Sequence, residues 1–234
     1  MPSYKIPWDD AKTMIGMYIR KLGPDSIYNH SVGGTISLSS FKSLEVVDIK
    51  FKGMMAWFCW NKAKNDFFLA FEYNKSYDPV NEMLTPENTN LQAPHPGNIF
   101  TVPQGIDPQI FLDTHRIGSA GADVIIPQAT VVQMKNDFVA NGPAYPGGKP
   151  LNKLPYSFFE NEINPDVTRF RAQPNIYAVR YYFGYDPGHQ TNEIRVILVP
   201  VDKSGQNVIP VPGDAASAAT VWALEQSWPP PPPL

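Results

Sequence analysis

The residues best suited to do chemistry lie in the segment 113–116, which reads Asp-Thr-His-Arg. A carboxylate near a histidine can orient the imidazole ring for proton transfer or for binding a metal ion. Asp113 and His115 are therefore the candidate catalytic residues. The pair works only if the fold brings the two side chains together, and the simpler interpretation is that both are ordinary surface residues of a loop.

Two arginines are the candidate ligand-binding residues. Arg180 and Arg195 alternate with apolar residues in segments that we predict to be strands, and their side chains could face each other across a hairpin. Opposing side chains of paired strands lie about 5 Å apart, so two such arginines would need an acidic partner or an anionic ligand. The simpler interpretation places both on a solvent-exposed face of the sheet.

Other catalytic and cofactor-binding patterns are absent from the sequence. It contains no phosphate-binding loop, GxGxxG fingerprint, HExxH helix, GxSxG elbow or calcium loop. The single cysteine, Cys59, excludes an intramolecular disulfide and a cysteine-rich zinc site, and its apolar neighbours predict a buried, unreactive thiol. We expect no cofactor and no metal, and a catalytic role is left open but not favoured.

The most distinctive surface feature is the proline-rich segment 228–234. Five consecutive prolines favour an extended polyproline II conformation, since proline lacks the backbone donor that a helix or an inner strand needs. Aromatic grooves recognise this preformed conformation, so the segment could dock on a protein partner or on a neighbouring copy. The alternative is an unstructured tail that only aids solubility. The candidate interaction residues are Trp228, Pro229, Pro230, Pro231, Pro232, Pro233 and Leu234.

Charge and hydropathy patterns restrict the partners. The 19 lysines and arginines oppose 22 aspartates and glutamates, a formal net charge of -3, which disfavours a nucleic-acid partner. No apolar stretch of about 18 residues occurs, and Asp9 and Asp10 fall where a secretory signal would have its apolar centre. We expect a soluble, cytoplasmic protein that does not contact membranes, with export without a cleaved signal as the open alternative.

An internal repeat organises the elements that must position these residues. Two segments that begin with Ile-Pro are predicted to form amphipathic helices, and they are 120 residues apart. Landmarks further on match at slightly different offsets, as loop insertions would produce. The matched pairs are Ile6-Pro7 with Ile126-Pro127, Met14 with Met134, Tyr18 with Phe138, Ser40-Phe41 with Ser157-Phe158, and Ala56 with Ala178.

Each half then continues with two apolar, aromatic-rich runs separated by a turn. In the first half these are MAWFCW and FFLAFEYNKS, and in the second half YAVRYYF and IRVILVPVDKS. Such runs predict a β-hairpin in each half. The aromatic side chains could form a stacking platform, but their apolar surroundings favour a structural core.

We predict an α+β fold of two related modules, each a helix on a small antiparallel sheet, packed as a pseudo-dimer. The N-terminal module covers 1–95, a packed linker rich in proline and glycine covers 96–119, and the C-terminal module covers 120–212. A short helix and a polyproline tail make up 213–234, because alanine-rich 214–228 has helical character. The alternative is a coincidental similarity between two ordinary α+β segments.

The second half resembles a pattern of small uncharacterised bacterial α+β proteins. In that pattern a helix is followed by an Arg-aromatic-aromatic-Gly strand and then by a strand ending in Val-Asp-x-x-Gly. No known activity accompanies the family, so the resemblance implies the module and no catalysis. The first half departs from the pattern at the arginine and the glycines. The matching residues are Arg180, Tyr182, Phe183, Gly184, Val199, Val201, Asp202 and Gly205.

These observations favour a non-catalytic structural or protein-interaction protein that uses its pseudo-symmetric surface and its proline tail. Self-association or a protein partner is expected, and a small-molecule ligand is left open. The alternative is an enzyme or a small-molecule-binding protein whose site lies between the modules. Aromatic residues would line that site together with Asp113, His115, Arg180 and Arg195.

Overall fold

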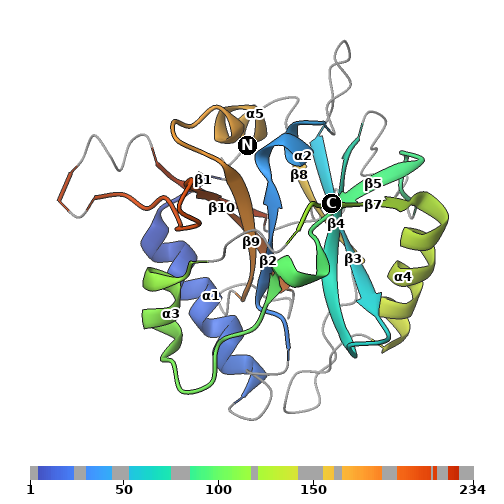
Figure 1. The fold of residues 1–234 in the computed structure, drawn as a ribbon, viewed down its shortest axis with the longest axis horizontal. Helices are drawn as coiled ribbons and strands as arrows, with labels where there is room; N and C mark the ends of the chain where they lie inside the picture. Colours follow the sequence, from blue (N-terminus) through green and yellow to red (C-terminus); the bar gives the residue numbers. More distant parts are fainter. Residues whose placement is uncertain are drawn as a thin grey trace, which may run out of the picture.

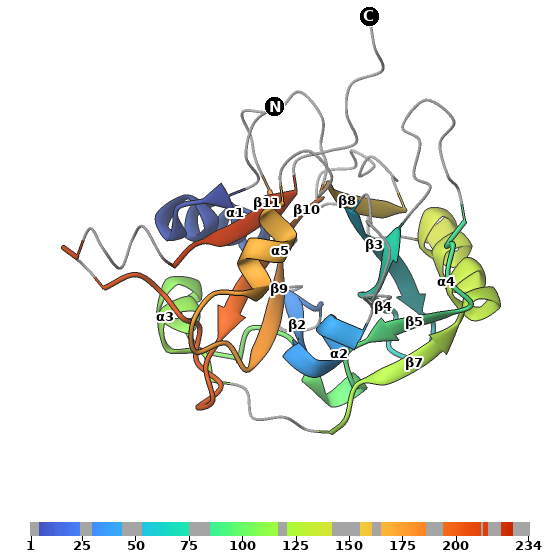
Figure 2. The same ribbon diagram turned by 90° about the horizontal axis from the view of Figure 1, so that it is seen from above.

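The fold is α+β and contains two antiparallel sheets that lie face to face (Figures 1 and 2). It is known from a computed structural model. The model describes residues 5–23, 30–43, 53–74, 85–116, 121–141, 155–160, 165–185, 194–211, 213–214 and 221–226. Seen from above, one helix layer covers the outer face of each sheet (Figure 2).

Six described strands form sheet A in the order β1-β11-β10-β9-β2-β6. At its centre β9 pairs antiparallel with β10, where Tyr181 lies opposite Leu198, and with β2, where Tyr181 lies opposite Gly34. The short strand β11 is inserted between β1 and β10. The strands are β1 (Lys5–Ile6), β2 (Gly33–Ser37), β6 (Ile99–Phe100), β9 (Ala178–Tyr185), β10 (Ile194–Val201) and β11 (Ala223–Gln226).

Five described strands form sheet B in the order β7-β5-β4-β3-β8. The long hairpin of β3 and β4 is its centre, with Ala56 opposite Phe71, and β8 pairs with the other edge of β3. The strands are β3 (Gly53–Asn61), β4 (Asp66–Asn74), β5 (Asn90–Ala93), β7 (Val124–Pro127) and β8 (Tyr156–Glu160). Both hairpins predicted from the sequence are thus confirmed.

Strand β3 shows why the sequence has continuous apolar runs instead of alternating ones. Its side chains Met54, Ala56 and Phe58 belong to the main core cluster, whereas Met55 and Trp57 belong to a second cluster on the opposite face of sheet B. A strand buried on both faces needs apolar residues at every position. The aromatic residues of the hairpins are therefore core residues, as the sequence favours.

The two predicted helices are confirmed and cover the outer faces of the sheets. Helix α1 (Trp8–Leu22) packs on β9 and β10 of sheet A, and α4 (Gln128–Asn141) packs on β3 of sheet B. In α1, Asp9 and Asp10 lie in the first turn and Arg20 and Lys21 in the last, an arrangement that the helix dipole favours. The shorter helices are α2 (Leu38–Ser43), α3 (Pro108–Thr114), α5 (Asp166–Arg171) and the 3-10 turn η1 (Pro96–Asn98).

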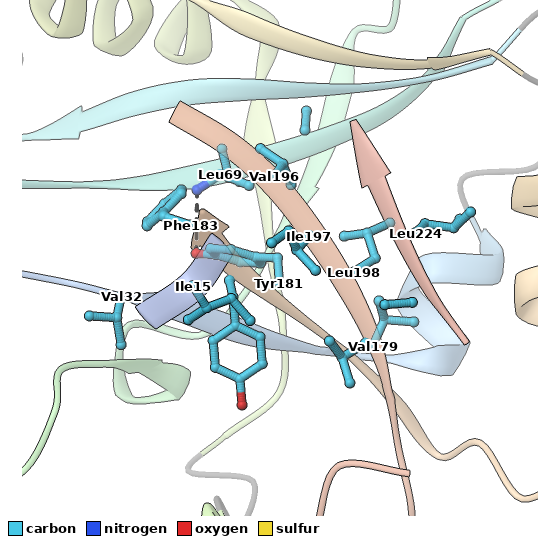
Figure 3. Packing of buried hydrophobic residues seen from close by; sticks show 14 of the residues in the cluster. Ile15, Val32, Leu69, Val179, Tyr181, Phe183, Val196, Ile197, Leu198 and Leu224 are labelled. Atoms are coloured by element: carbon cyan, nitrogen blue, oxygen red, sulfur yellow. Dashed lines mark hydrogen bonds between the residues drawn. The ribbon is translucent and has the colours of Figure 1, made fainter. Parts of the chain in front are cut away.

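The core between the sheets is closed by large aromatic and aliphatic side chains. Tyr181 of β9 is fully buried, and its hydroxyl accepts a hydrogen bond from the backbone nitrogen of Leu69 in β4 at 3.4 Å (Figure 3). This bond links sheet A to sheet B. Phe183 packs beside Tyr181 with ring centroids 5.6 Å apart. The segment after residue 95 is also packed, because Phe100, Phe111 and Leu112 are buried.

Two predictions about the arrangement of the halves are wrong. Each sheet was expected to belong to one half, but sheet A combines β1, β2 and β6 with β9, β10 and β11, and sheet B likewise mixes both halves. The matched residues Ser40-Phe41 and Ser157-Phe158 lie in different kinds of element, helix α2 and strand β8. Each sheet pairs strands that are distant in sequence, and local patterns cannot reveal such pairings.

The predicted C-terminal helix is also wrong where the structure describes it. Ala223–Gln226 form strand β11, although alanine-rich sequence favours a helix. Trp222, Ala223 and Leu224 are all buried, and β11 gains hydrogen-bonded neighbours on both sides. Tertiary packing therefore overrides the local preference. The remainder of the predicted helix, 215–220 and 227–228, lies outside the described residues.

Candidate functional site

The predicted pair of Asp113 and His115 is not formed. Asp113 lies in α3, and its two carboxylate oxygens accept hydrogen bonds from Lys12 Nζ at 2.7 and 2.9 Å near the surface. His115 follows the helix immediately, and only 8% of it is exposed. Residues two positions apart at a helix end do not face each other. Asp113 therefore cannot orient the imidazole ring.

His115 instead belongs to a buried polar network on the outer face of sheet A. Its Nδ1 atom lies 3.2 Å from the hydroxyl oxygen of Tyr182, and that hydroxyl accepts a hydrogen bond from Asn207 Nδ2 at 2.8 Å. The imidazole ring packs against Phe100 and Phe111, with centroid distances of 4.4 and 4.2 Å. The aromatic cage and the hydroxyl fix the orientation of the ring.

Arg180 is the centre of the same network and is fully buried. Its guanidinium donates to Asn207 Oδ1 at 2.6 Å, to Thr35 Oγ1 at 3.1 Å and to the carbonyl oxygen of Gly205 at 2.9 Å. A fourth, longer contact reaches the carbonyl oxygen of His115 at 3.5 Å. All of these acceptors are neutral, so the positive charge is stabilised by dipoles and not by a carboxylate.

The network holds His115 in its neutral form. Burial, and to a smaller extent the nearby charge of Arg180, lower the pKa of His115 to about 3. Burial also raises the pKa of the Tyr182 hydroxyl. A histidine with so low a pKa is a weak base, and its ring is enclosed by aromatic side chains. The network therefore attaches two loops to sheet A and is poorly suited to proton transfer.

The second candidate arginine lies apart from the first. Arg195 is opposite Gly184 and Arg180 is opposite Val199, so the two arginines are on the same face of the hairpin but do not face each other. Arg195 is 1% exposed, and its Nε atom lies 4.0 Å from the carboxylate of Glu225 in β11. The expected anion site between the arginines and the expected solvent-exposed face are both wrong, because helix α1 covers this face of the sheet.

A polar pocket of about 500 Å³ lies between the end of β2, the start of β9 and the turn that follows β10. Both halves of the sequence contribute to it. Its wall includes the Thr35 hydroxyl that accepts from Arg180 and the Gly205 backbone, so the buried network lies directly behind it. Its polar lining residues are Thr35, Ser37, Ser39, Ser40, Asn98, Asp123, Asp202, Lys203 and Ser204.

An apolar groove of about 1000 Å³ runs along the beginning of α1. Residues from β1, from the segment after β10 and from the residues before β11 form its walls. Val211 is the most exposed apolar side chain of the groove, at 59%. The apolar lining residues are Ile6, Pro7, Trp8, Ile209, Pro210, Val211, Val221 and Trp222. We call this the Trp groove.

The remaining candidates from the sequence are Cys59, the proline-rich segment and possible metal ligands. Cys59 is fully buried, and burial raises the pKa of its thiol to about 12, so it is the unreactive thiol that the sequence predicts. The proline-rich segment from Trp228 to Leu234 lies outside the described residues. Within the described part of the chain, no group of three or more His, Cys, Asp or Glu side chains could hold a metal ion.

No protein-family model, curated protein or solved structure matches the chain. The resemblance of the second half to small bacterial α+β proteins therefore stays a prediction. None of the described helices is long and apolar enough to cross a membrane.

Proposed function

We propose that the chain is an internal duplication whose two halves exchange strands. Each half contains strand, helix, strand, helix and three further strands, in that order, if β6, η1 and α3 are set apart as the connection. Replacing each strand of β1-β11-β10-β9-β2 by its counterpart gives β7-β5-β4-β3-β8, which is the order of sheet B. Unrelated α+β segments have no reason to share this order.

Aromatic contacts near the centre support the same relation. The 120-residue offset makes Tyr18 of α1 equivalent to Phe138 of α4. The strand registers, followed from β1 and β7 through the sheets, make Phe58 equivalent to Phe183. The same registers make Ala56 equivalent to Tyr181 and so replace the sequence match of Ala56 with Ala178. Tyr18 packs on Phe183 at 5.6 Å and Phe138 on Phe58 at 5.0 Å, while Phe58 and Phe183 contact each other at 6.0 Å. Equivalent residues that meet in this way are expected beside a pseudo-two-fold axis.

We propose further that this protein is a non-catalytic interaction protein that associates with itself. The segment from Trp228 to Leu234 of one copy docks in the Trp groove of another copy. The groove is the observation that supports this function, because its apolar surface combines Pro7, Pro210 and the exposed Val211 with the edges of two tryptophans, Trp8 and Trp222, that are each 7% exposed. Aromatic-lined apolar grooves are the usual receptors of polyproline II segments, which lose little entropy on binding.

The occupant is better supplied by a second copy than by the same chain. Trp222 lines the groove and directly precedes β11. Four extended residues span about 13 Å, so the end of β11 at Gln226 lies about that far from the groove. To return, the chain would have to reverse at Ser227 and Trp228. A residue before a proline is biased towards extended conformations, and the prolines that follow are stiff. Docking on another molecule needs no such reversal.

The enzyme alternative has less support. Asp113 and His115 are separated, His115 is neutral and enclosed, and Arg195 lies beside Glu225. None of the four predicted catalytic or ligand-binding side chains combines reactivity with access to a ligand. The predicted small-molecule site between the halves has a better candidate in the polar pocket, which is considered below.

Analytical ultracentrifugation of the full chain tests the proposed self-association. The tail variant replaces Pro230, Pro231 and Pro232 by serine, and the groove variant is Val211→Asp. We expect each variant to associate about tenfold more weakly than the native chain, because each loses apolar contact worth about 1.4 kcal/mol. Ile125→Asp is the matched control, since Ile125 is 62% exposed on β7 of sheet B. If the native chain stays monomeric at about 0.5 mM, its dissociation constant is in the millimolar range or above. That result would exclude the proposal.

A further inference from the structure

We propose that the polar pocket binds a neutral saccharide. The proposal is independent of self-association, because the pocket and the Trp groove share no lining residue. The pocket volume of about 500 Å³ lies within the range of about 300–1,000 Å³ that is typical of small-molecule sites. Many of its lining side chains carry hydroxyl or carboxylate groups.

The carboxylates of the pocket retain acceptor atoms that the fold does not use. Asp123 accepts a hydrogen bond from the backbone nitrogen of Ser37 through Oδ2 only, at 2.8 Å. Asp202 accepts from the backbone nitrogens of Ser204 and Gln206 through Oδ1 only, at 2.8 and 3.0 Å. The second oxygen of each carboxylate has no hydrogen-bond partner among the described residues. Two acceptors held in place in this way suit a ligand that presents several hydroxyl donors.

The hydroxyl groups of the pocket provide both donors and acceptors. Thr35 Oγ1 accepts from Arg180 Nε at 3.1 Å, so its own hydrogen is directed to another acceptor. Ser37, Ser39 and Ser40 form a cluster in which Ser37 Oγ lies 3.1 Å from Ser39 Oγ and 2.9 Å from Ser40 Oγ. Groups that can donate and accept match saccharide hydroxyls, which do the same.

The pocket wall carries charges of both signs and therefore favours an uncharged ligand. Asp123 and Asp202 are negative and Lys203 is positive, while the Arg180 guanidinium behind Thr35 and the charge of Arg116 near Asp202 add to the positive side. A phosphorylated or carboxylated ligand would meet two carboxylates. A cationic ligand would meet the lysine and the buried guanidinium.

Tyr177 provides the apolar surface that a sugar ring needs. It lies just before β9, lines the pocket and is 61% exposed, so its ring is accessible to a ligand. Two hydrogen bonds fix its backbone. Tyr177 N donates to Val201 O at 2.8 Å, and the Tyr177 carbonyl accepts from Leu38 N at 3.1 Å. An amphipathic ring fixed beside hydroxyls and carboxylates can stack on the C–H face of a pyranose while the sugar hydroxyls bond to the wall.

Ligand-observed NMR and calorimetry on the full chain test the proposal. The probes are glucose, galactose, mannose, N-acetylglucosamine, maltose and cellobiose, with glucose 6-phosphate, glucosamine and inorganic phosphate as charged comparisons. We expect at least one neutral probe to bind with a millimolar or lower dissociation constant. Each charged derivative should bind more weakly than its neutral parent, because the pocket wall presents charges of both signs to it.

Three variants locate the binding in the pocket. Tyr177→Ala removes the ring and should weaken binding at least about tenfold, whereas Tyr177→Phe keeps the stacking face and should stay within about threefold. Asp123→Asn can keep the bond to Ser37 but loses the unused acceptor, and should also weaken binding about tenfold. Asp137→Asn is the matched control, because Asp137 pairs with Lys62 on the sheet B side and should leave binding unchanged.

Three results would overturn the proposal. The first is the absence of binding to every neutral probe at about 20 mM, far above a millimolar constant. The second is tighter binding of phosphate or glucose 6-phosphate than of glucose, which would indicate an anion site. The third is binding that Tyr177→Ala and Asp123→Asn leave unchanged, which would place the saccharide elsewhere. Self-association is unaffected by any of these outcomes, because Val211 is remote from the pocket lining.

Discussion

Acidification should lower the free energy of unfolding because His115 is buried in its neutral form. The pKa of His115 falls from the ordinary value of 6.5 to about 3 on folding, chiefly because burial disfavours the imidazolium. Protonation therefore favours the unfolded chain. The stabilisation from keeping His115 neutral is fully present above pH 6.5 and is lost as the pH falls towards 3.

The size of the effect follows from the two pKa values. At pH 4.5 the unfolded histidine is about 99% protonated and the folded one remains about 97% neutral. This difference favours unfolding by about 2.7 kcal/mol at pH 4.5, against about 0.2 kcal/mol at pH 7. Lowering the pH from 7 to 4.5 should thus cost the native chain about 2.5 kcal/mol through this residue alone.

Urea unfolding of the native chain and of His115→Phe at both pH values isolates this contribution. Phenylalanine fits between Phe100 and Phe111 but cannot titrate, and it loses the contact with the Tyr182 hydroxyl. We expect the variant to be about 1 kcal/mol less stable at pH 7 and more stable than the native chain at pH 4.5. Carboxylates titrate in both proteins and cancel in the comparison. Equal losses in both proteins between the two pH values would refute the reasoning.

Three further changes probe the network and the packing. Arg180→Met removes the guanidinium donors at the centre of the buried network and leaves their acceptors unsatisfied, so it should lower the free energy of unfolding by about 3–5 kcal/mol in urea titrations. A loss under about 1 kcal/mol would contradict its central position. Gly33→Ala would place a Cβ atom against the Tyr181 carbonyl oxygen, so thermal unfolding should show a loss of about 1–3 kcal/mol. An unchanged melting temperature would argue against this close approach. The Cys59 thiol should react with a disulfide reagent only in denaturant, whereas rapid reaction of the native protein would be inconsistent with its burial.

The sequence predicts the local elements well, because their signals are local. The apolar stripe of α1 and the paired runs of β3 and β4 identify a helix and a hairpin without reference to the rest of the chain. Which strands lie side by side is a different question. The pairing of β2 with β9 and of β8 with β3 joins residues about 100 or more positions apart, and no sequence pattern specifies it.

The sites depend on those distant pairings and were predicted only in part. His115 and Arg180 do share one network, as the sequence suggests, but through Tyr182 and Asn207 and not through Asp113. Asn207 stands in a turn among several polar residues and gives no signal of its own. The polar pocket is formed by segments from both halves, so Ser37 of the first half and Asp123 and Tyr177 of the second half line it together only in the folded chain.

Mixing the two association variants tests the central claim most directly. The tail variant with serine at positions 230, 231 and 232 keeps its Trp groove, and Val211→Asp keeps its proline-rich segment. Each variant alone should associate about tenfold more weakly than the native chain, whereas an equimolar mixture should form a one-to-one complex held by one unaltered tail-in-groove contact. A mixture that remains monomeric while the native chain associates would contradict the claim that one copy's segment occupies another copy's groove.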